Sequence, residues 1–175
     1  MYFKELKVDE INLKLFEYFQ RHQTITHCWR KIDGAWCVKE VLFTNDWDNE
    51  EYLTLVTSLK RTVASGGIVF GVFFGEALKG FTSVEPTFFG RNNEYLDLSS
   101  LHVSEDMRGK GVGKELFHLA KTWAKEHGAK KLYISSHSAV ESHAFYHAVG
   151  CVEAREYSRH HVEKEPYDCQ LECKL

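Results

Sequence analysis

The stretch from Tyr95 to Lys114 constrains the fold of this chain more than any other part of the sequence. It is typical of a β-strand followed by a glycine-rich turn over residues 108–113 and then by an amphipathic helix. Glycines let backbone N–H groups turn toward a ligand, because no Cβ stands in the way. The first helical turn adds unpaired N–H donors and the positive end of the helix dipole. With the charges of Arg108 and Lys110 beside it, this arrangement predicts a pyrophosphate-binding site.

Two common phosphate-binding motifs do not fit the spacing of this turn. A P-loop needs a glycine five residues before its Gly-Lys pair and a Ser or Thr after the lysine, but Arg108 and Glu115 stand there. A dinucleotide-binding G-x-G-x-x-G motif needs a further glycine, which is missing at Lys114 and Leu116. The pattern that remains is R-x-x-G-x-G over residues 108–113.

This remaining pattern resembles the coenzyme A pyrophosphate loop of the GCN5-related N-acetyltransferase (GNAT) superfamily. The preceding Leu-His-Val at 101–103 resembles the end of that family's central strand, and the F-Y-x-x-x-G segment at 145–150 resembles the end of a later helix. Two positions depart from the family pattern. Cys151 stands where a phenylalanine is usual, and Ala139 stands where an asparagine often opens the helix. Neither position is expected to lie at the chemistry, so the departures bear on the subfamily more than on the fold.

The rest of the chain predicts an α/β fold with a single domain over residues 1–175. Apolar periodicity and turn residues predict strands at 2–8, 68–74, 81–84, 95–103, 131–136, 151–157 and 167–175. Helical spacing and capping residues predict helices at 9–19, from 48, at 112–127 and at 138–149, with 24–47 irregular. This element order is that of the GNAT superfamily. The resemblance therefore implies a mixed, strongly twisted sheet of about seven strands flanked by about four helices and split beside the acetyl-CoA-binding strand.

Composition excludes several other classes of protein. The net charge is −3, from 22 basic and 25 acidic side chains, and no long basic run would support binding to nucleic acid. A mildly acidic surface suits a cationic amine.

The five cysteines are odd in number and include no Cys-x-x-Cys, which favours free thiols in a reducing compartment. No leader and no apolar run of membrane-spanning length is evident, so we expect a cytoplasmic protein without a membrane partner.

The resemblance implies that the chain binds acetyl-CoA and transfers its acetyl group to an amine. Backbone N–H groups of the loop should hold the pyrophosphate, and the edge of the preceding strand should pair with the pantetheine amides. The N–H near Leu101 could polarise the acetyl carbonyl. No metal is expected, because the His143 and His147 pair lacks a third ligand. The expected cofactor-binding residues are Leu101, His102, Val103, Arg108, Gly109, Lys110, Gly111, Val112, Gly113 and Lys114.

Catalysis requires a group that protonates the departing thiolate and a route for the proton of the amine. The resemblance places Tyr146 beside the coenzyme A sulfur as the general acid, although a core-facing aromatic is the alternative. Asp97 and Glu85 are the candidate bases, acting directly or through water, and either could instead be a solvated carboxylate. If strand pairing is regular, Asp97 shares a face with Leu101 and Val103, whereas a β-bulge would change that alternation.

The sequence leaves the acceptor open. Direct attack by a primary amine in a ternary complex is expected, and the absence of an additional recognition domain favours a small-molecule amine over a protein N-terminus or lysine. A second hypothesis is an acyl-CoA-binding sensor that has lost catalysis. A third is a module that uses the aromatic residues 24–47 to bind a partner, which a second copy of the chain in a homodimer could provide.

Overall fold

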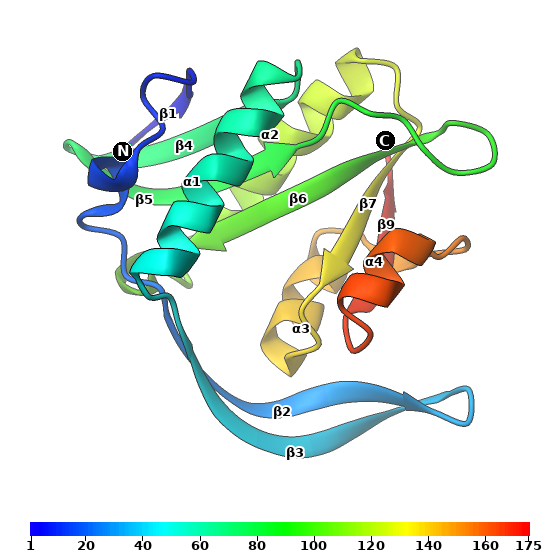
Figure 1. Cartoon of the computed structure of the whole chain (residues 1–175). Coiled ribbons are helices and arrows are strands. Elements are labelled where there is room, and N and C mark those ends of the chain that lie inside the picture. Colours follow the sequence, from blue (N-terminus) through cyan, green and yellow to red (C-terminus); the bar gives the residue numbers. More distant parts are fainter.

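A seven-stranded mixed sheet forms the centre of the computed structural model, which describes residues 1–175 (Figure 1). Its strands lie in the order β1-β4-β5-β6-β7-β9-β8, and only the β6–β7 pair is parallel. The strands are β1 (Tyr2–Glu5), β4 (Ile68–Phe74), β5 (Ala77–Val84), β6 (Tyr95–Val103), β7 (Lys131–Ser136), β8 (Val152–Glu153) and β9 (Cys169–Lys174). The predicted α/β class with a seven-stranded sheet is confirmed.

Four α-helices and two short 3-10 helices accompany the sheet. They are α1 (Asn49–Ala64), α2 (Val112–Glu126), α3 (Val140–Ala148), α4 (Arg159–Lys164), η1 (Leu13–Phe16) and η2 (Glu105–Met107). Figure 1 shows α1 in front of the sheet and α2 behind it. The core is divided accordingly: Val56 and Leu59 of α1 pack against Phe81, whereas Phe117 and Ala120 of α2 belong to the cluster on the other face.

Local chemistry explains why these helices begin where they do. The Asp48 side chain accepts hydrogen bonds from the N–H groups of Glu50 and Glu51, and the Glu51 side chain accepts one from the Asp48 N–H. This reciprocal capping box fixes the start of α1 as the sequence predicted. Helix α2 instead begins after Gly111, whose left-handed conformation (φ 82°) lets the chain enter the helix directly from the glycine-rich turn.

The sheet splits in the middle. Strands β6 and β7 pair only from Tyr95 opposite Lys131 to Asp97 opposite Tyr133. Beyond Asp97 the two strands diverge, although β6 continues to pair with β5 on its other edge as far as Val103. The split that the family resemblance implied beside this strand is therefore present.

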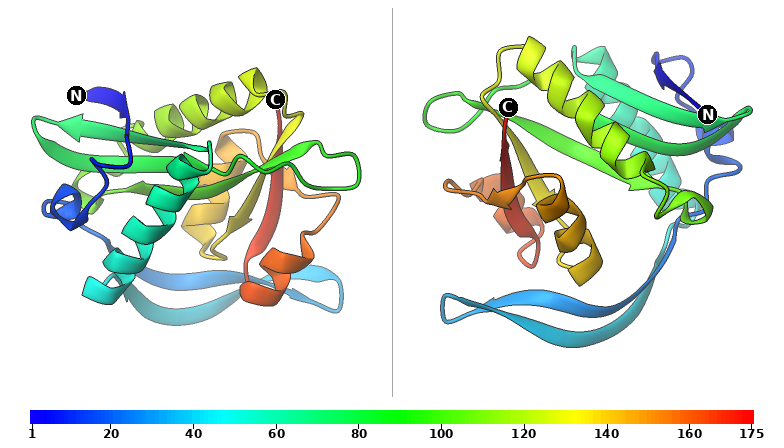
Figure 2. Two further views of the ribbon diagram at one scale, coloured as in Figure 1. Left: turned by 45° about the horizontal axis from the view of Figure 1, so that its top comes forward. Right: turned by 180° about the vertical axis from the view of Figure 1, so that it is seen from behind.

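Residues 24–47 are not irregular, so that prediction is wrong. They form a long antiparallel hairpin of β2 (His22–Ile32) and β3 (Ala35–Asp46), joined at Asp33 and Gly34 with φ values of 50° and 81°. Two consecutive residues with positive φ make the turn that suits the twist of paired strands, and Asp-Gly is its preferred sequence. The hairpin extends away from the sheet and passes below the split, where the Trp29 N–H donates to the Ser138 carbonyl at 2.8 Å (Figures 1 and 2).

Other predicted elements differ in kind or extent. The helix predicted over 9–19 is reduced to η1, although its apolar residues Ile11 and Phe19 are buried as expected. The strand predicted over 151–157 contains only Val152–Glu153, and α4 follows it in a stretch for which no element was predicted. Ser138 does not cap α3, because its hydroxyl accepts a hydrogen bond from Arg30 (2.6 Å) instead. None of the helices combines the length and apolar character needed to cross a lipid bilayer.

Candidate active site

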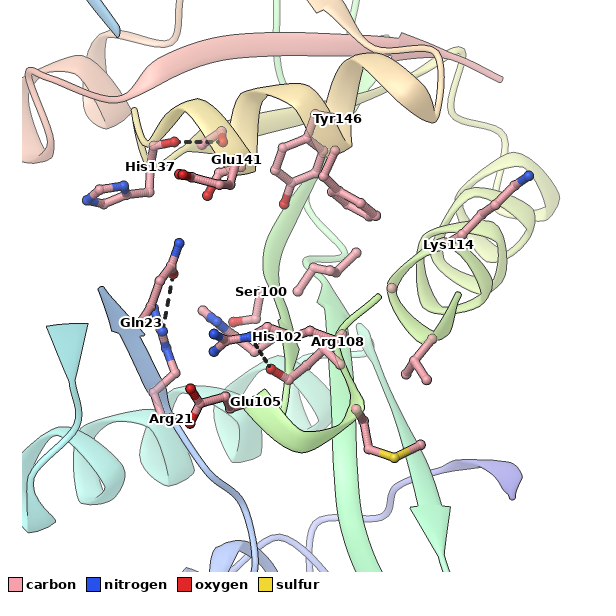
Figure 3. Close-up of a pocket in the computed structure, with 18 of the residues that line it drawn as sticks. Arg21, Gln23, Ser100, His102, Glu105, Arg108, Lys114, His137, Glu141 and Tyr146 are labelled. Atoms are coloured by element: carbon pink, nitrogen blue, oxygen red, sulfur yellow. Dashed lines mark hydrogen bonds between the residues drawn. The ribbon is translucent and has the colours of Figure 1, made fainter. Parts of the chain in front are cut away.

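A cavity of about 830 Å³ occupies the split between β6 and β7. Its walls are the beginning of β2, the second half of β6, the glycine-rich turn with the first turn of α2, the end of β7, and the first turns of α3 (Figure 3). The cavity therefore joins segments that lie far apart in the sequence. Of the expected cofactor-binding residues, all except Lys110 line it. The Lys110 ammonium instead donates to the Asp106 carbonyl at 2.8 Å.

The glycine-rich turn presents a row of free donors. Gly109 and Gly111 have φ values of 71° and 82°, which a residue with a Cβ rarely adopts. The backbone N–H groups of residues 109–113 make no hydrogen bond within the protein, in contrast to the N–H groups of Arg108 and Lys114. Unpaired N–H groups at the N-terminus of a helix are suited to an anion. The turn thus has the donors that a coenzyme A pyrophosphate requires.

The first turn of α2 also lies unusually close to α3. A Cβ on Gly113 would lie 3.1 Å from Cε2 of Phe145 and 3.6 Å from Cγ2 of Val103. The absence of a side chain therefore sets how far the end of β6, the start of α2 and α3 stand from one another. Phe145 and Val103 both line the cavity, so this close contact shapes its wall.

A β-bulge interrupts β6 within the cavity. Ser83 of β5 pairs with Ser100 while Val84 pairs with Leu98, so Ser99 is the extra residue. Because the bulge reverses the alternation, Leu98 and Leu101 both pack on the α2 side of the sheet. Asp97 therefore does not share a face with Leu101 and Val103, and the expectation based on regular pairing is wrong.

The two candidate bases, Asp97 and Glu85, both lie outside the cavity lining. The Asp97 carboxylate lies 3.1 Å from Nε2 of His161, and its hydrogen bond to that ring raises the pKa of His161. Its other oxygen is buried without a partner. Glu85 is linked to the cavity by a hydroxyl group, because Oγ of the cavity-lining Ser99 donates to the Glu85 carboxylate at 3.0 Å. Thr62 donates to the same oxygen at 2.6 Å.

Tyr146 projects from α3 with its hydroxyl directed into the cavity (Figure 3). The side chain is only 9% exposed, and its hydroxyl makes no hydrogen bond within the protein. Burial, assisted by the nearby Cys151, Asp168 and Asp97, raises the pKa of the phenol above its usual value. The group is consequently a neutral donor at physiological pH and is free to act on a bound molecule.

The sequence analysis did not identify several polar residues of the cavity. Arg21 and Gln23 enter from the start of the hairpin, Glu105 from η2, and Glu141 from α3 (Figure 3). His102 was expected as a cofactor contact, and its ring meets the Trp47 ring edge to face with a centroid distance of 4.7 Å. Burial and the charges of Arg21 and Arg108 lower the pKa of His102 to about 3, so the ring is neutral. The Asp-Gly turn was the one signal that could have revealed the hairpin behind Arg21.

A glycine-rich turn with free N–H donors, a split sheet and a neutral phenol in one cavity suit an acyltransferase that uses coenzyme A. A match to the model of the acetyltransferase (GNAT) family spans residues 16–151. The chain therefore belongs to the acetyltransferase (GNAT) family, and acetyl-CoA is its acyl donor. No curated protein matches the chain significantly.

Solved structures show the same fold at low sequence identity. A Bacillus anthracis str. Ames protein provisionally named a streptothricin acetyltransferase, in complex with acetyl coenzyme A, has a TM-score of 0.74 at 18% identity, covering 99% of this chain and 98% of that chain. A nourseothricin acetyltransferase has a TM-score of 0.70 at 16% identity, with coverage of 99% and 97%. A PaiA N-acetyltransferase from Thermoplasma acidophilum, in complex with coenzyme A, has a TM-score of 0.60 at 15% identity over 100% of both chains.

Proposed function

We propose that this protein transfers the acetyl group of acetyl-CoA to a primary amine of a small molecule, by direct attack within a ternary complex. The observation that carries the proposal is the single cavity shared by the free N–H groups of residues 109–113 and the hydroxyl of Tyr146. Its volume of about 830 Å³ is in the range of small-molecule sites. The hairpin passing below the split favours a small acceptor over a folded protein surface. The names of two structural relatives, which refer to streptothricin and nourseothricin, agree with a small acceptor.

Each step of the transfer has a candidate group in this chain. The N–H groups of residues 109–113 hold the pyrophosphate, and the backbone N–H near Leu101, beside the bulge at Ser99, polarises the acetyl carbonyl. The amine attacks the thioester carbon, and the carbon–sulfur bond breaks as the tetrahedral intermediate collapses. Tyr146 then donates its proton to the departing thiolate. Because burial raises the pKa of the phenol, Tyr146 retains this proton until it is needed.

For the proton of the amine, we propose Glu85 acting through Ser99 rather than Asp97. The Ser99 hydroxyl lies in the cavity and donates to Glu85, whereas Asp97 is paired with His161 on the opposite face from Leu101. A chain of one hydroxyl and ordered water can carry a proton from the amine to the carboxylate.

Exchanging each carboxylate for its amide tests this choice. Glu85→Gln should lower kcat/KM for the amine by about 10- to 100-fold, because the proton loses its acceptor. Asp97→Asn keeps the same shape near His161 and should lower kcat/KM by less than about threefold. Steady-state rates of thiol release at saturating acetyl-CoA measure both effects. The reverse order, with Asp97→Asn the more damaging change, would assign the base to Asp97.

Calorimetric titration with acetyl-CoA, followed by assays of thiol release against a panel of primary amines, tests the proposed function itself. We expect one site per chain with a Kd in the micromolar range, and thiol release only when an amine is present. Binding without amine-dependent release would favour an acyl-CoA sensor. The absence of binding would refute the assignment of the pyrophosphate to residues 109–113.

A further inference from the structure

We propose that the acceptor amine also carries a carboxylate, which Arg21 binds, with the charge of Arg108 beside it, at the side of the cavity away from Tyr146. The inference rests on the proposed function and identifies the class of its acceptor. Figure 3 shows Arg21, His102 and Arg108 gathered on one side of the cavity, with Tyr146 across from them.

Arg21 is a cavity-lining cation that lacks an ionic partner. Its guanidinium lies over the Trp47 ring at 4.9 Å from the centroid, and its Nε is buried with no hydrogen-bond partner. Its one side-chain hydrogen bond is a long contact of 3.4 Å to Oε1 of Gln23. Buried charged groups are normally paired, because an unpaired polar group away from water is costly. The free Nε of Arg21 is thus a donor that a ligand can satisfy.

A second guanidinium lies close enough to repel the first. Burial and the charge of Arg108 both lower the pKa of Arg21. Arg108 donates from Nε to the Val103 carbonyl at 3.3 Å and likewise forms no ion pair with a carboxylate. Neutral His102 between them offers no compensating negative charge. Two cations held together in this way attract an anion, and the planar guanidinium is suited to a carboxylate.

Carboxylates of the protein are present in the area but are engaged elsewhere or lie too far away. Asp46 pairs with His22 at 2.7 Å, and Glu51 caps the start of α1. Glu105 lines the cavity, but its carboxylate is not within ion-pair distance (4.0 Å) of Arg21 or Arg108. The anion that completes this site must therefore come from a bound molecule.

The position of the site assigns the anion to the acceptor rather than to acetyl-CoA. His102, Trp47 and Phe81 pack together on the α1 face of the sheet. Leu101 and Val103 pack on the α2 face, beside the helix whose first turn holds the free N–H groups. The end of β6 thus separates Arg21, which lies over Trp47, from the pyrophosphate cradle, whereas Arg108 begins the turn that forms this cradle. An acceptor that enters from the α1 face would place its carboxylate on Arg21 and its amine near Ser99 and Ser100.

A chain-length series of amines tests the proposal. Unbranched ω-amino acids, from glycine to 6-aminohexanoate, are compared with alkylamines of equal length that lack the carboxylate. We expect kcat/KM to be about tenfold or more higher for the amino acids at one or two lengths. Equal values for both series, or turnover of alkylamines alone, would overturn the inference. A failure to bind acetyl-CoA would instead overturn the proposed function.

Three variants then test whether Arg21 is the residue that causes the preference for amines with a carboxylate. Arg21→Met should lower kcat/KM for the preferred amino acid by about 10- to 100-fold, mostly through a higher KM. For the alkylamine of equal length, kcat/KM should change by less than about threefold. Arg21→Lys keeps the charge and should retain part of the preference. Arg30→Met is the matched control, since Arg30 belongs to the same hairpin and its guanidinium likewise lies over an aromatic ring, that of Tyr167, but outside this cavity. Arg30→Met should leave the ratio of kcat/KM for the amino acid to kcat/KM for the alkylamine unchanged.

Two results with Arg21→Met would overturn the inference. One is an equal loss for both substrates, which would show that Arg21 only supports the packing of Trp47. The other is a raised Kd for acetyl-CoA with the substrate ratio preserved, which would show that the anion belongs to the acyl donor. Melting temperatures of all variants, measured without ligand, separate either result from partial unfolding.

Discussion

Replacing Tyr146 with phenylalanine should lower kcat by about 100-fold and change the Kd of acetyl-CoA by less than about threefold. The hydroxyl points into the cavity and has no partner in the protein, so its removal leaves no buried group unsatisfied. The ring remains and keeps its packing against Phe117, at 6.2 Å between centroids. The loss should therefore appear in the chemical step. Steady-state kinetics and calorimetry on the same preparation measure the two quantities.

The pH dependence adds a second readout. Because the pKa of Tyr146 is raised, the phenol keeps its proton as pH increases, and its donor form persists beyond the usual tyrosine value of about 10. Wild-type activity should therefore show no alkaline decline from this group below about pH 10. Full activity of Tyr146→Phe at every pH would remove Tyr146 from the acid role.

Tyr133→Phe is a useful control for the Tyr146 result. Tyr133 is also a buried phenol, but its hydroxyl donates to Gln170 and accepts from the Ser158 N–H at 2.9 Å, and it does not line the cavity. Its removal should reduce the melting temperature and leave kcat nearly unchanged. The pair of variants thus separates a phenol that acts on substrate from one that stabilises the fold.

The parts of the site that local sequence determines could be predicted. The R-x-x-G-x-G turn at 108–113 encodes its own geometry, since glycines at 109 and 111 permit positive φ and the apolar stripe that follows continues as α2. Tyr146 was found through its F-Y-x-x-x-G context on α3. The capping box at Asp48 and Glu51 likewise located α1 correctly. In each case the residues that determine the conformation are neighbours in the chain.

The parts that depend on distant partners could not be predicted. The bulge at Ser99 exists only in relation to β5, and it moved Asp97 away from the face that regular alternation assigned to it. The arginine pair joins Arg21 to a loop almost ninety positions later in the chain, and no local pattern connects them. The helix predicted over 9–19 failed because its apolar residues meet the core through a single 3-10 turn. The bulge, the proximity of the two arginines and the shortened helix all depend on tertiary packing, which local sequence does not determine.

Gly113 belongs to the glycine-rich turn, but the space around it is limited by Phe145 of α3. Gly113→Val should therefore weaken acetyl-CoA binding by about tenfold or more, equivalent to about 1.4 kcal/mol. The Cβ alone would contact the Phe145 ring at 3.1 Å, and the two further methyl groups of valine have to find space between the start of α2 and α3. A branched residue in a helix cannot rotate freely to avoid the clash. Either Phe145 moves within the cavity that it lines or the two helices separate, and both changes disturb the approach of the cofactor to the N–H groups of residues 109–113.

Calorimetry with acetyl-CoA measures the effect, and two further variants calibrate it. Gly113→Ala adds a single carbon at the same contact and should raise the Kd less than valine does. Lys125→Val places the same branched side chain at an exposed position in the last turn of α2, and should lower helix stability without affecting the Kd. An unchanged Kd in Gly113→Val, with the melting temperature maintained, would mean that the cofactor does not pass between α2 and α3. The pyrophosphate would then have to reach the free N–H groups from the opposite side of the turn.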